Sequence, residues 1–326
     1  MGQLIIGGAG FIGVNLVSFL LDQGNEVSVY HRKSTSLTDL KEFEFKSIIG
    51  ELNDEETLKQ AIGNCKVVYN LAACTSSLKK ESAQRQAINV VAARDIARIA
   101  REAGVRLVHV SSIAAVGSPE HGAIADESQE FNWHQDPYAV SKHYGDLEVL
   151  KEVALGLNAV IACPGNVVGG LAMKQGQKNN FRAIANGSMK FYPSGGVCLT
   201  DVDDLVRGIA LCGEKGAAGR RFILGGHNVN FKEYFEEIAV ASGGLKPWIR
   251  LPGFLLPLAG WGLEIIFGIL GKEPPLNRNT GEVVSRNLYY SSQLAIDELG
   301  YEIGDWRLAI KKATLKSTIA KTTNPE

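Results

Sequence analysis

Short apolar runs rich in β-branched residues alternate with helical periods along the first half of the chain. The runs predict strands at residues 4–6, 26–30, 48–49, 67–72, 105–111 and 159–163. Apolar residues at helical spacing between them predict helices at residues 11–22, 84–102 and 136–156. Strands separated by helices are typical of βαβ units, so the pattern predicts a parallel sheet covered by helices.

Beyond residue 164 this alternation breaks down, and glycine-rich loops appear. We therefore expect a nucleotide-binding domain made of residues 1–165 with about 197–225. A smaller α+β substrate lobe would be assembled from about 166–196 and 226–326. The expected fold class is α/β, a Rossmann-type doubly wound parallel sheet with this smaller C-terminal lobe over its carboxyl edge.

The apolar stretch at residues 251–270 approaches the length of a membrane span. It contains Pro252, Pro257 and Glu264, and two prolines with a charge argue against a spanning helix. Two interpretations stay open. We favour a buried or pocket-lining helix of the second lobe, and the alternative is an amphipathic surface helix in peripheral contact with a bilayer.

Charge and cysteine content restrict the partners and the compartment. The chain has 34 basic and 35 acidic residues, and it has no basic block, which argues against a nucleic-acid partner. The cysteines are Cys65, Cys74, Cys163, Cys198 and Cys212. They form no CxxC pair and lie in apolar runs, which predicts small buried side chains in a reducing, cytoplasmic compartment. The histidines show no metal-ligand spacing, so we expect no metal site.

Three glycines follow the first predicted strand and open the first helix. Gly7, Gly10 and Gly13 suit a tight turn, a close backbone approach to a pyrophosphate, and close packing of helix on strand. The helix beyond them offers free N–H groups and the positive end of its dipole. This arrangement predicts a dinucleotide site at the start of the chain.

The end of the second predicted strand indicates which dinucleotide. An acidic residue there would bind the ribose hydroxyls of NAD, whereas an arginine accommodates a 2′-phosphate. No acid occurs between Tyr30 and Thr38. We therefore predict NADP, with NAD as the alternative, and assign Arg32 as the phosphate ligand with Lys33 and Ser34 as helpers. A solvated turn with two surface cations is the competing interpretation.

Tyr138 and Lys142 lie four residues apart at the start of a predicted helix, so their side chains share one face. A nearby ammonium favours the phenolate, and we expect it to lower the pKa of Tyr138 toward the working range of a proton donor. Ser112 follows a predicted strand, where its hydroxyl could bind a substrate oxygen. These residues predict carbonyl reduction or alcohol oxidation.

With these motifs in place, the sequence resembles the extended short-chain dehydrogenase/reductases of the NAD-dependent epimerase/dehydratase superfamily. The resemblance is greatest to the dihydroflavonol-reductase-like and 3β-hydroxysteroid-dehydrogenase-like branch, which includes homologues of a hopanoid-associated sugar epimerase. It rests on pieces that occur in the family's order along almost the whole chain: residues 7–13, 50–54, 70–73, Asn89, 110–117, 138–142, 164–169 and 200–204.

The resemblance implies a role for each matching residue. Tyr138 would be the catalytic acid/base, Lys142 would bind the nicotinamide ribose and tune Tyr138, and Ser112 would bind the substrate oxygen. A homodimer through two long helices is also implied. The implied cofactor contacts are Gly7, Gly10, Phe11, Ile12, Gly13, Glu51, Leu52, Leu71, Ala72, Ala73, Tyr138, Lys142, Pro164, Asn166 and Val167.

Departures from the family pattern narrow the reaction. Ile113 and Ala114 stand where sugar-nucleotide dehydratases carry an Asp-Glu pair, and residues 115–117 lack the tyrosine of UDP-galactose epimerases. Ile6, Glu51 and Asn70 also depart from common family residues, at positions that affect cofactor fit.

We therefore predict an NADP-dependent oxidoreductase that interconverts a ketone and a secondary alcohol. The apolar segment 254–269 suggests a steroid-, lipid- or flavonoid-like substrate. An NDP-sugar epimerase with tightly bound NAD(P) is the alternative, and a redox-sensing binding protein is a third hypothesis.

Overall fold

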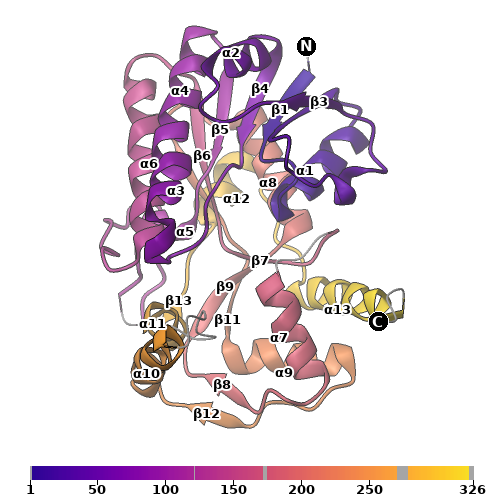
Figure 1. The fold of residues 1–326 in the computed structure, drawn as a ribbon, viewed down its shortest axis with the longest axis vertical. Coiled ribbons are helices and arrows are strands. Elements are labelled where there is room, and N and C mark those ends of the chain that lie inside the picture. The colour runs from indigo at the N-terminus through magenta and orange to yellow at the C-terminus, as the bar shows by residue number, and fades with distance from the viewer. Residues whose placement is uncertain (1, 121, 172–174, 270–277, 323–326) are drawn as a thin grey trace.

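A seven-stranded parallel sheet forms the larger part of the computed structural model, which describes residues 2–120, 122–171, 175–269 and 278–322. Its strand order is β10-β6-β5-β4-β1-β2-β3 (Figure 1). The chain builds outward from β1 in one direction and from β4 in the other, so the predicted doubly wound fold is confirmed. The strands are β1 (Gly2–Ile6), β2 (Val27–His31), β3 (Lys46–Ile49), β4 (Cys65–Asn70), β5 (Arg106–Val110), β6 (Ala159–Pro164) and β10 (Arg221–Leu224).

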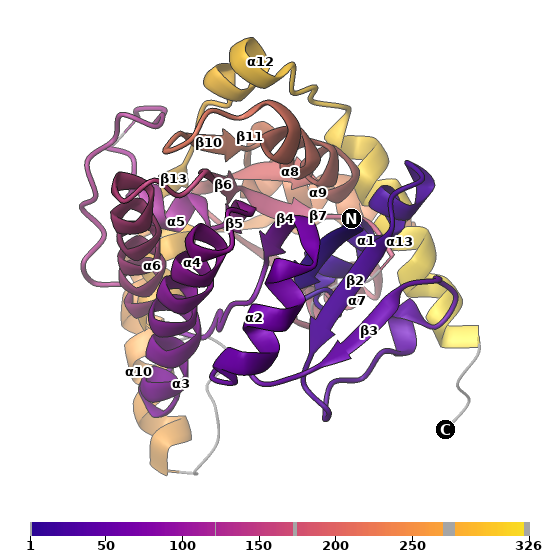
Figure 2. The same cartoon turned by 90° about the horizontal axis from the view of Figure 1, so that it is seen from above.

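Helices cover both faces of this sheet (Figure 2). Strand side chains alternate between the faces, so Leu4 and Ile6 lie in one buried cluster and Ile5 in the other. The first face packs against α2 (Glu55–Gly63), α4 (Ala92–Glu102) and α6 (Pro137–Ala154), and the second against α1 (Phe11–Asp22), α8 (Val202–Lys215) and α12 (Gln293–Leu299).

A smaller lobe lies beyond the carboxyl edge of the large sheet (Figure 1). Its four-stranded sheet contains β7 (Asn166–Val168), β9 (Gly196–Asp201), β11 (His227–Asn230) and β13 (Asn287–Leu288). Around it lie α7 (Gln175–Ala185), α9 (Phe231–Ser242) and α13 (Trp306–Thr322), with the strand pair β8 (Phe191–Pro193) and β12 (Ile249–Leu251) and the helices α10 (Leu255–Ile269) and α11 (Arg278–Ser285). Strand β9 belongs to this small sheet, while α8 and β10 return to the large one.

Several elements of the large domain differ from the sequence-based expectation, which contained no strand at β10 and no helix at α8 or α12. Helix α2 was not predicted, although Asp54 caps it by accepting a hydrogen bond from the Thr57 N–H at 3.2 Å. The predicted helix at 84–102 comprises α3 (Ser82–Gln86), a π-helical turn at Ala87–Val91, and α4. Short single turns lie at Thr38–Leu40, Lys79–Glu81 and α5 (Ile113–Val116).

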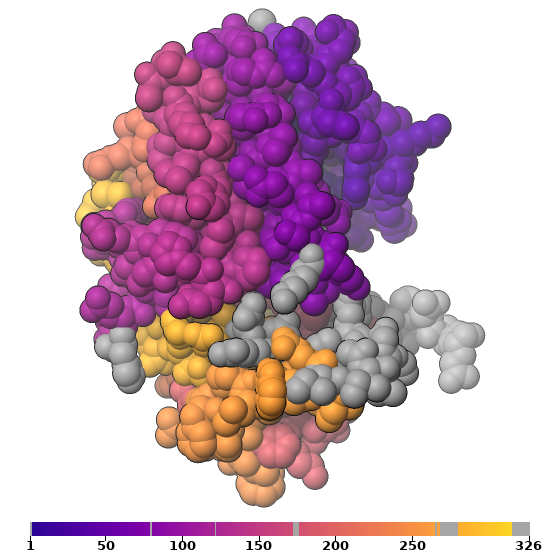
Figure 3. Space-filling view, turned by 60° about the vertical axis from the view of Figure 1, so that its left-hand side comes forward, coloured from indigo at the N-terminus to yellow at the C-terminus, as the bar shows by residue number. Residues whose placement is uncertain are grey.

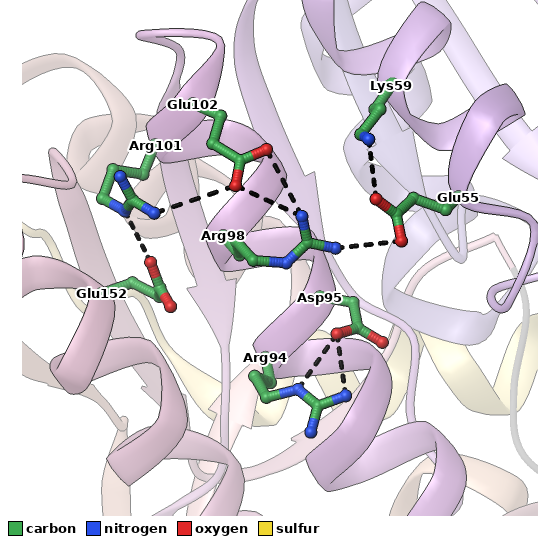
Figure 4. Close-up of polar contacts among 8 residues, drawn as sticks. All are labelled: Glu55, Lys59, Arg94, Asp95, Arg98, Arg101, Glu102 and Glu152. Atoms are coloured by element: carbon green, nitrogen blue, oxygen red, sulfur yellow. Dashed lines mark hydrogen bonds and ion pairs between the residues drawn. The ribbon is translucent and has the colours of Figure 1, made fainter.

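Ion pairs connect three of the helices on one face (Figure 4). Arg98 of α4 contacts Glu55 of α2 at 3.2 Å, and Arg101 contacts Glu152 of α6 at 2.7 Å. These side chains are partly exposed, and such pairs contribute about 0–1 kcal/mol each. The packing of wholly buried residues such as Ile96 is therefore the larger influence on how these helices lie.

The apolar stretch at 251–270 forms a surface element. Phe254, Leu258 and Trp261 are 71%, 61% and 55% exposed, whereas Leu256 on the opposite side of α10 is buried. The prediction that segment 251–270 is a buried or pocket-lining helix is therefore wrong for the outer face of α10. Position 270 lies outside the described residues. Within the described part of the chain, every helix is too short or too polar to cross a bilayer.

Candidate active site

The loop between β1 and α1 is shaped by backbone packing that excludes side chains. Gly7 has φ +85°, a conformation that favours glycine. A Cβ at Gly13 would lie 2.5 Å from the Gly7 carbonyl oxygen and 2.6 Å from the Gly8 Cα. The loop and the first turn of α1 therefore approach closely only because these positions lack side chains.

Helix α1 begins at this loop without a side-chain cap. Gly10 is its N-cap residue, and the first turn carries no acidic side chain. The N–H groups at this end therefore remain available to an anion. The loop lies at the carboxyl end of β1, whose neighbours are β4 and β2. This is where the strand order reverses, the usual position of a dinucleotide in such sheets, so the cradle fits a pyrophosphate.

The other predicted cofactor residues follow the carboxyl ends of neighbouring strands. Arg32 follows β2 and is exposed; Glu51 and Leu52 follow β3; Leu71 to Ala73 follow β4. Pro164 ends β6, and Asn166 and Val167 open β7. Phe11 and Ile12 lie half-buried in the first turn of α1. Because the strands of the large sheet are parallel, the residues that follow β2, β3 and β4 or end β6 lie at one edge of it, and Asn166 and Val167 lie just beyond this edge in the small sheet.

Buried polar side chains hold two of these loops. The Tyr30 hydroxyl donates a hydrogen bond to the Glu51 carbonyl oxygen at 2.7 Å. Asn70 accepts a hydrogen bond from the Ala72 N–H at 3.2 Å, and its amide lies 3.3 Å from Nδ1 of His109 on β5. These contacts fix the backbone on either side of the predicted site.

Helix α6 begins where the sequence predicted. Asp136 is its N-cap residue, and Oδ1 accepts hydrogen bonds from the N–H groups of Tyr138 at 2.7 Å and Ala139 at 3.1 Å. Pro137 occupies the first turn, where its missing N–H leaves no unsatisfied donor. Ser77 donates a further hydrogen bond to Asp136 Oδ1 at 3.2 Å. This hydrogen bond ties the start of α6 to the loop after β4.

Ser112 and Tyr138 come together in the structure. Ser112 caps α5, where its Oγ accepts a hydrogen bond from the Ala114 N–H at 3.2 Å. Burial raises the pKa of Tyr138 to about 12; a hydrogen bond with Ser112 opposes this rise, and the charge of Asp136 adds to it. The expectation that Lys142 would lower the pKa of Tyr138 below its ordinary value is therefore wrong for this structure, in which burial has the larger effect.

Lys142 is buried beneath Tyr138, one helical turn further along α6. Its Nζ donates a hydrogen bond to the Val110 carbonyl oxygen at 2.9 Å, at the end of β5. Burial lowers the pKa of Lys142, and the carboxylate of Asp146 one turn further on opposes this shift. The side chains at 138, 142 and 146 therefore form one row along the face of α6 that meets the sheet.

The sequence reasoning missed the buried polar cluster at the end of this row. Asp146 is fully buried, with Oδ2 3.3 Å from the Arg221 guanidinium and Oδ1 3.6 Å from His109 Nε2. Burial raises the pKa of Asp146, and Arg221 and Lys142 oppose that rise. Burial also lowers the pKa of His109 well below its usual range. Asp146 therefore provides negative charge behind Lys142.

Asn89 attaches α6 to the loop after β4. Its amide donates hydrogen bonds to Ser141 Oγ and to the Cys74 carbonyl oxygen, both at 2.9 Å, and its Oδ1 accepts one from the Cys74 N–H at 2.8 Å. Asn89 lies in the π-helical turn between α3 and α4. The π-helical turn therefore places the Asn89 side chain between the loop after β4 and helix α6, where both of its N–H groups and its oxygen form hydrogen bonds.

A small pocket lies beside the N-terminus of α6. It is lined by Trp133, Gln135 and Asp136 from the large domain and by Glu282 and Val283 of α11. The pocket thus joins the smaller lobe to the residue that caps the Tyr138 helix. No cluster of three or more metal-binding side chains occurs among the described residues.

A sequence model of the NAD dependent epimerase/dehydratase family matches residues 3–225. The chain belongs to this family. Its members carry the Rossmann-type fold and the extended short-chain dehydrogenase/reductase organisation described above, and this chain is an NAD(P)-dependent enzyme of that type.

Individual relatives cover nearly the whole chain. A Synechocystis protein provisionally named a dihydroflavonol 4-reductase is 29% identical, over 91% of this chain and 88% of its own. The 3-beta-hydroxysteroid dehydrogenase of Mycolicibacterium neoaurum is 26% identical, over 92% and 86%. The crystal structure of gox2253 superposes with a TM-score of 0.86 at 27% identity, covering 99% of both chains.

Proposed function

We propose that this protein is an NADP-dependent oxidoreductase that interconverts a ketone and a secondary alcohol on a fairly apolar small molecule. The observation that carries the proposal is the placement of Ser112 beside Tyr138, above buried Lys142, at the same sheet edge as the β1–α1 glycine loop. This arrangement supplies a proton donor, a second hydrogen-bond donor and a cation within one structural unit.

In the reducing direction, the Tyr138 hydroxyl donates its proton to the substrate carbonyl oxygen. The Ser112 hydroxyl donates a hydrogen bond to the same oxygen and stabilises the charge that develops there. Lys142 provides the nearby positive charge, and its 2.9 Å hydrogen bond to the Val110 carbonyl holds it in the core. When bound, the nicotinamide supplies or accepts the hydride.

Arg32 supports NADP as the cofactor. Its side chain is exposed beyond the end of β2, and it forms no ion pair with any other described residue. A charge-assisted hydrogen bond to a 2′-phosphate contributes about 1.5–3 kcal/mol. We therefore expect Arg32→Ala to raise the Kd of NADPH roughly 10- to 100-fold, while the Kd of NADH changes less than about twofold. Equal changes for both would show that Arg32 does not bind the 2′-phosphate.

The relatives support an apolar substrate class. Two are named for a dihydroflavonol reductase and a 3-beta-hydroxysteroid dehydrogenase, whose names denote ketone or alcohol chemistry on largely apolar ring systems. Segment 254–269 contributes less support than the sequence suggested, because Phe254, Leu258 and Trp261 point outward.

Turnover assays test the proposal. Purified protein should oxidise NADPH with at least one steroid-, lipid- or flavonoid-like ketone, and Tyr138→Phe should reduce kcat by about 10²- to 10⁴-fold with little change in dinucleotide affinity. Surviving activity in this variant would contradict the mechanism. Epimerisation of a nucleotide sugar with a retained dinucleotide, without NADPH consumption, would favour the epimerase alternative.

We also propose that the chain is a cytoplasmic homodimer. Its five cysteines are buried and unpaired, as expected in a reducing compartment. Helices α4 and α6 lie side by side (Figure 2), and α6 exposes Tyr144 at 53% and Leu147 at 37%. Sedimentation equilibrium of the wild type and of Tyr144→Arg would test a dimer through these helices.

A further inference from the structure

Helix α10 lies at one side of the smaller lobe (Figure 1), and its outer face exposes large apolar side chains. Positions 254, 258 and 261 recur at helical spacing and share this face. Trp248, which directly precedes β12 and lies six residues before Phe254, is also 73% exposed. We call Trp248, Phe254, Leu255, Leu258, Trp261 and Ile266 the outer α10 surface.

The opposite face of α10 is already occupied. Leu256 is buried, and a Cβ at Gly281 of α11 would collide with the Leu256 carbonyl oxygen, so the two helix backbones are in close contact. Phe254, Leu258 and Trp261 therefore face away from the contact between α10 and α11. Soluble proteins rarely expose a patch of this kind unless it binds a partner.

Two basic side chains lie beside the Trp248 end of this surface. Trp248 donates its backbone N–H to the Lys190 carbonyl oxygen at 3.0 Å, which places Lys190 beside it, and Arg250 lies two residues further along β12. Both cations are exposed, and neither forms an ion pair with another described residue. Glu264 is the one acidic residue within α10.

This combination identifies the chemistry of the partner. Tryptophan, phenylalanine and leucine beside lysine and arginine suit the interface of a bilayer, where apolar side chains enter the acyl boundary and cations meet anionic headgroups. A second copy of this chain would instead bring the same positive charges against Lys190 and Arg250. Charge complementarity therefore favours an anionic lipid surface over a second copy.

The surface is connected to the proposed active site. Helix α11 packs on the inner side of α10 and places Glu282 and Val283 in the pocket beside Asp136. Figure 3 shows the α10–α11 region, in orange, directly below the helices of the large domain. An apolar molecule leaving a bilayer at the outer α10 surface would therefore emerge near the lobe boundary at Asp136, the N-cap residue of the helix that carries Tyr138.

We propose that the outer α10 surface docks on a bilayer containing anionic lipid, and that the apolar substrate reaches the site from that bilayer. The second part rests on the proposed oxidoreductase function. The first part rests only on the exposed side chains and the charges around them.

The four tryptophans of the chain make a direct test feasible. Trp248 and Trp261 lie on the outer α10 surface, whereas Trp133 and Trp306 are buried. Vesicles of phosphatidylcholine and phosphatidylglycerol should co-float with the protein, and brominated phosphatidylcholine in them should quench its fluorescence. Quenching should vanish in Trp248→Phe/Trp261→Phe while flotation persists, because phenylalanine retains the apolar contact.

Matched variants test whether vesicle binding depends on the outer α10 surface or on any exposed apolar residue. Phe254→Glu/Leu258→Glu should reduce vesicle affinity at least about 10-fold, because it replaces two apolar contacts with the acyl region by carboxylates that anionic headgroups repel. Leu155→Glu, at the C-terminal end of α6 and 66% exposed, should leave affinity unchanged. Omitting phosphatidylglycerol should weaken binding roughly 10- to 30-fold, at about 1 kcal/mol for each of two cations.

Three outcomes would overturn the proposal. These are absence of flotation with mixed vesicles, equal loss of affinity in Leu155→Glu, and a wild-type dimer that dissociates in Phe254→Glu/Leu258→Glu. The last would show that a second copy covers the surface. With a water-soluble ketone, Phe254→Glu/Leu258→Glu should retain wild-type kcat/KM, so failed docking and failed oxidoreductase activity give different results.

Discussion

Asp136 combines two effects on the proposed acid/base residue, and two substitutions separate them. Its Oδ1 caps α6 through the N–H groups of Tyr138 and Ala139, at 2.7 and 3.1 Å. Its negative charge also raises the pKa of Tyr138. Asp136→Ala removes both the acceptor and the charge, whereas Asp136→Asn removes only the charge.

The cap sets the expected change in stability. Loss of an N-cap acceptor costs about 0.5–2 kcal/mol, and loss of a carboxylate at a helix N-terminus adds about 0.3–1 kcal/mol. We therefore expect Asp136→Ala to lower the free energy of unfolding by about 1–2 kcal/mol, or the Tm by about 1–3 °C for a chain of this size. Asp136→Asn should remain within about 0.5–1 kcal/mol of the wild type, because asparagine is an equally good cap.

The charge sets the expected change in the pH profile. Alcohol oxidation requires deprotonated Tyr138, so kcat/KM should rise with pH through the pKa of this group. Removing the negative charge of Asp136 lowers that pKa, and the rise should move about 0.3–0.6 pH units toward lower pH in Asp136→Asn. Thermal melts and pH profiles of both variants provide the measurement. A rise that stays in place or moves upward, or an Asn variant as unstable as the Ala variant, would refute this reasoning.

Other positions give independent predictions. Gly13→Ala should weaken NADPH binding more than 10-fold in a fluorescence titration, because its Cβ would meet backbone atoms at 2.5–2.6 Å; Gly63→Ala, which meets nothing within 4 Å, is the control. Asn89→Ala should lower the free energy of unfolding by about 2–4 kcal/mol in urea melts, since it leaves the N–H and carbonyl groups of buried Cys74 without this partner and removes one of the two hydrogen bonds of the Ser141 hydroxyl; an effect below about 0.5 kcal/mol would contradict the buried network. Because the folded protein keeps His109 neutral, the unfolded chain binds more protons below about pH 6.5. Stability should therefore fall as the pH drops from 7 to 5, by up to about 1.4 kcal/mol per pH unit for this group, with a shallower slope in His109→Gln; identical slopes would show that His109 is not the source.

Hydrophobic periodicity predicted the large sheet because its strands and helices each bury a regular face. It missed α2, which buries few apolar residues, namely Leu58, Ala61 and Ile62. It also treated residues 84–102 as one helix, since a π-helical turn changes the hydrogen-bond pattern without interrupting the run of helix-forming residues.

The predicted site residues lie at one sheet edge because the motifs follow consecutive parallel strands, and their individual roles stay predictions. The sequence could not reveal that His109, Asp146 and Arg221 meet behind Lys142, since they come from β5, α6 and β10. Nor could it show that burial dominates the pKa of Tyr138, which depends on packing from several elements.

The path of the chain between the lobes has a mechanical consequence. The large sheet leads into β7 after β6 and into β11 after β10, while the small lobe leads back through β9 into α8 and through β13 toward α12. Truncation after residue 165 would remove β10 and α8, exposing an edge of the sheet and one of its buried faces. Four separate connections of the chain therefore join the two lobes. Any change in the angle between the lobes must alter the backbone at all four connections together.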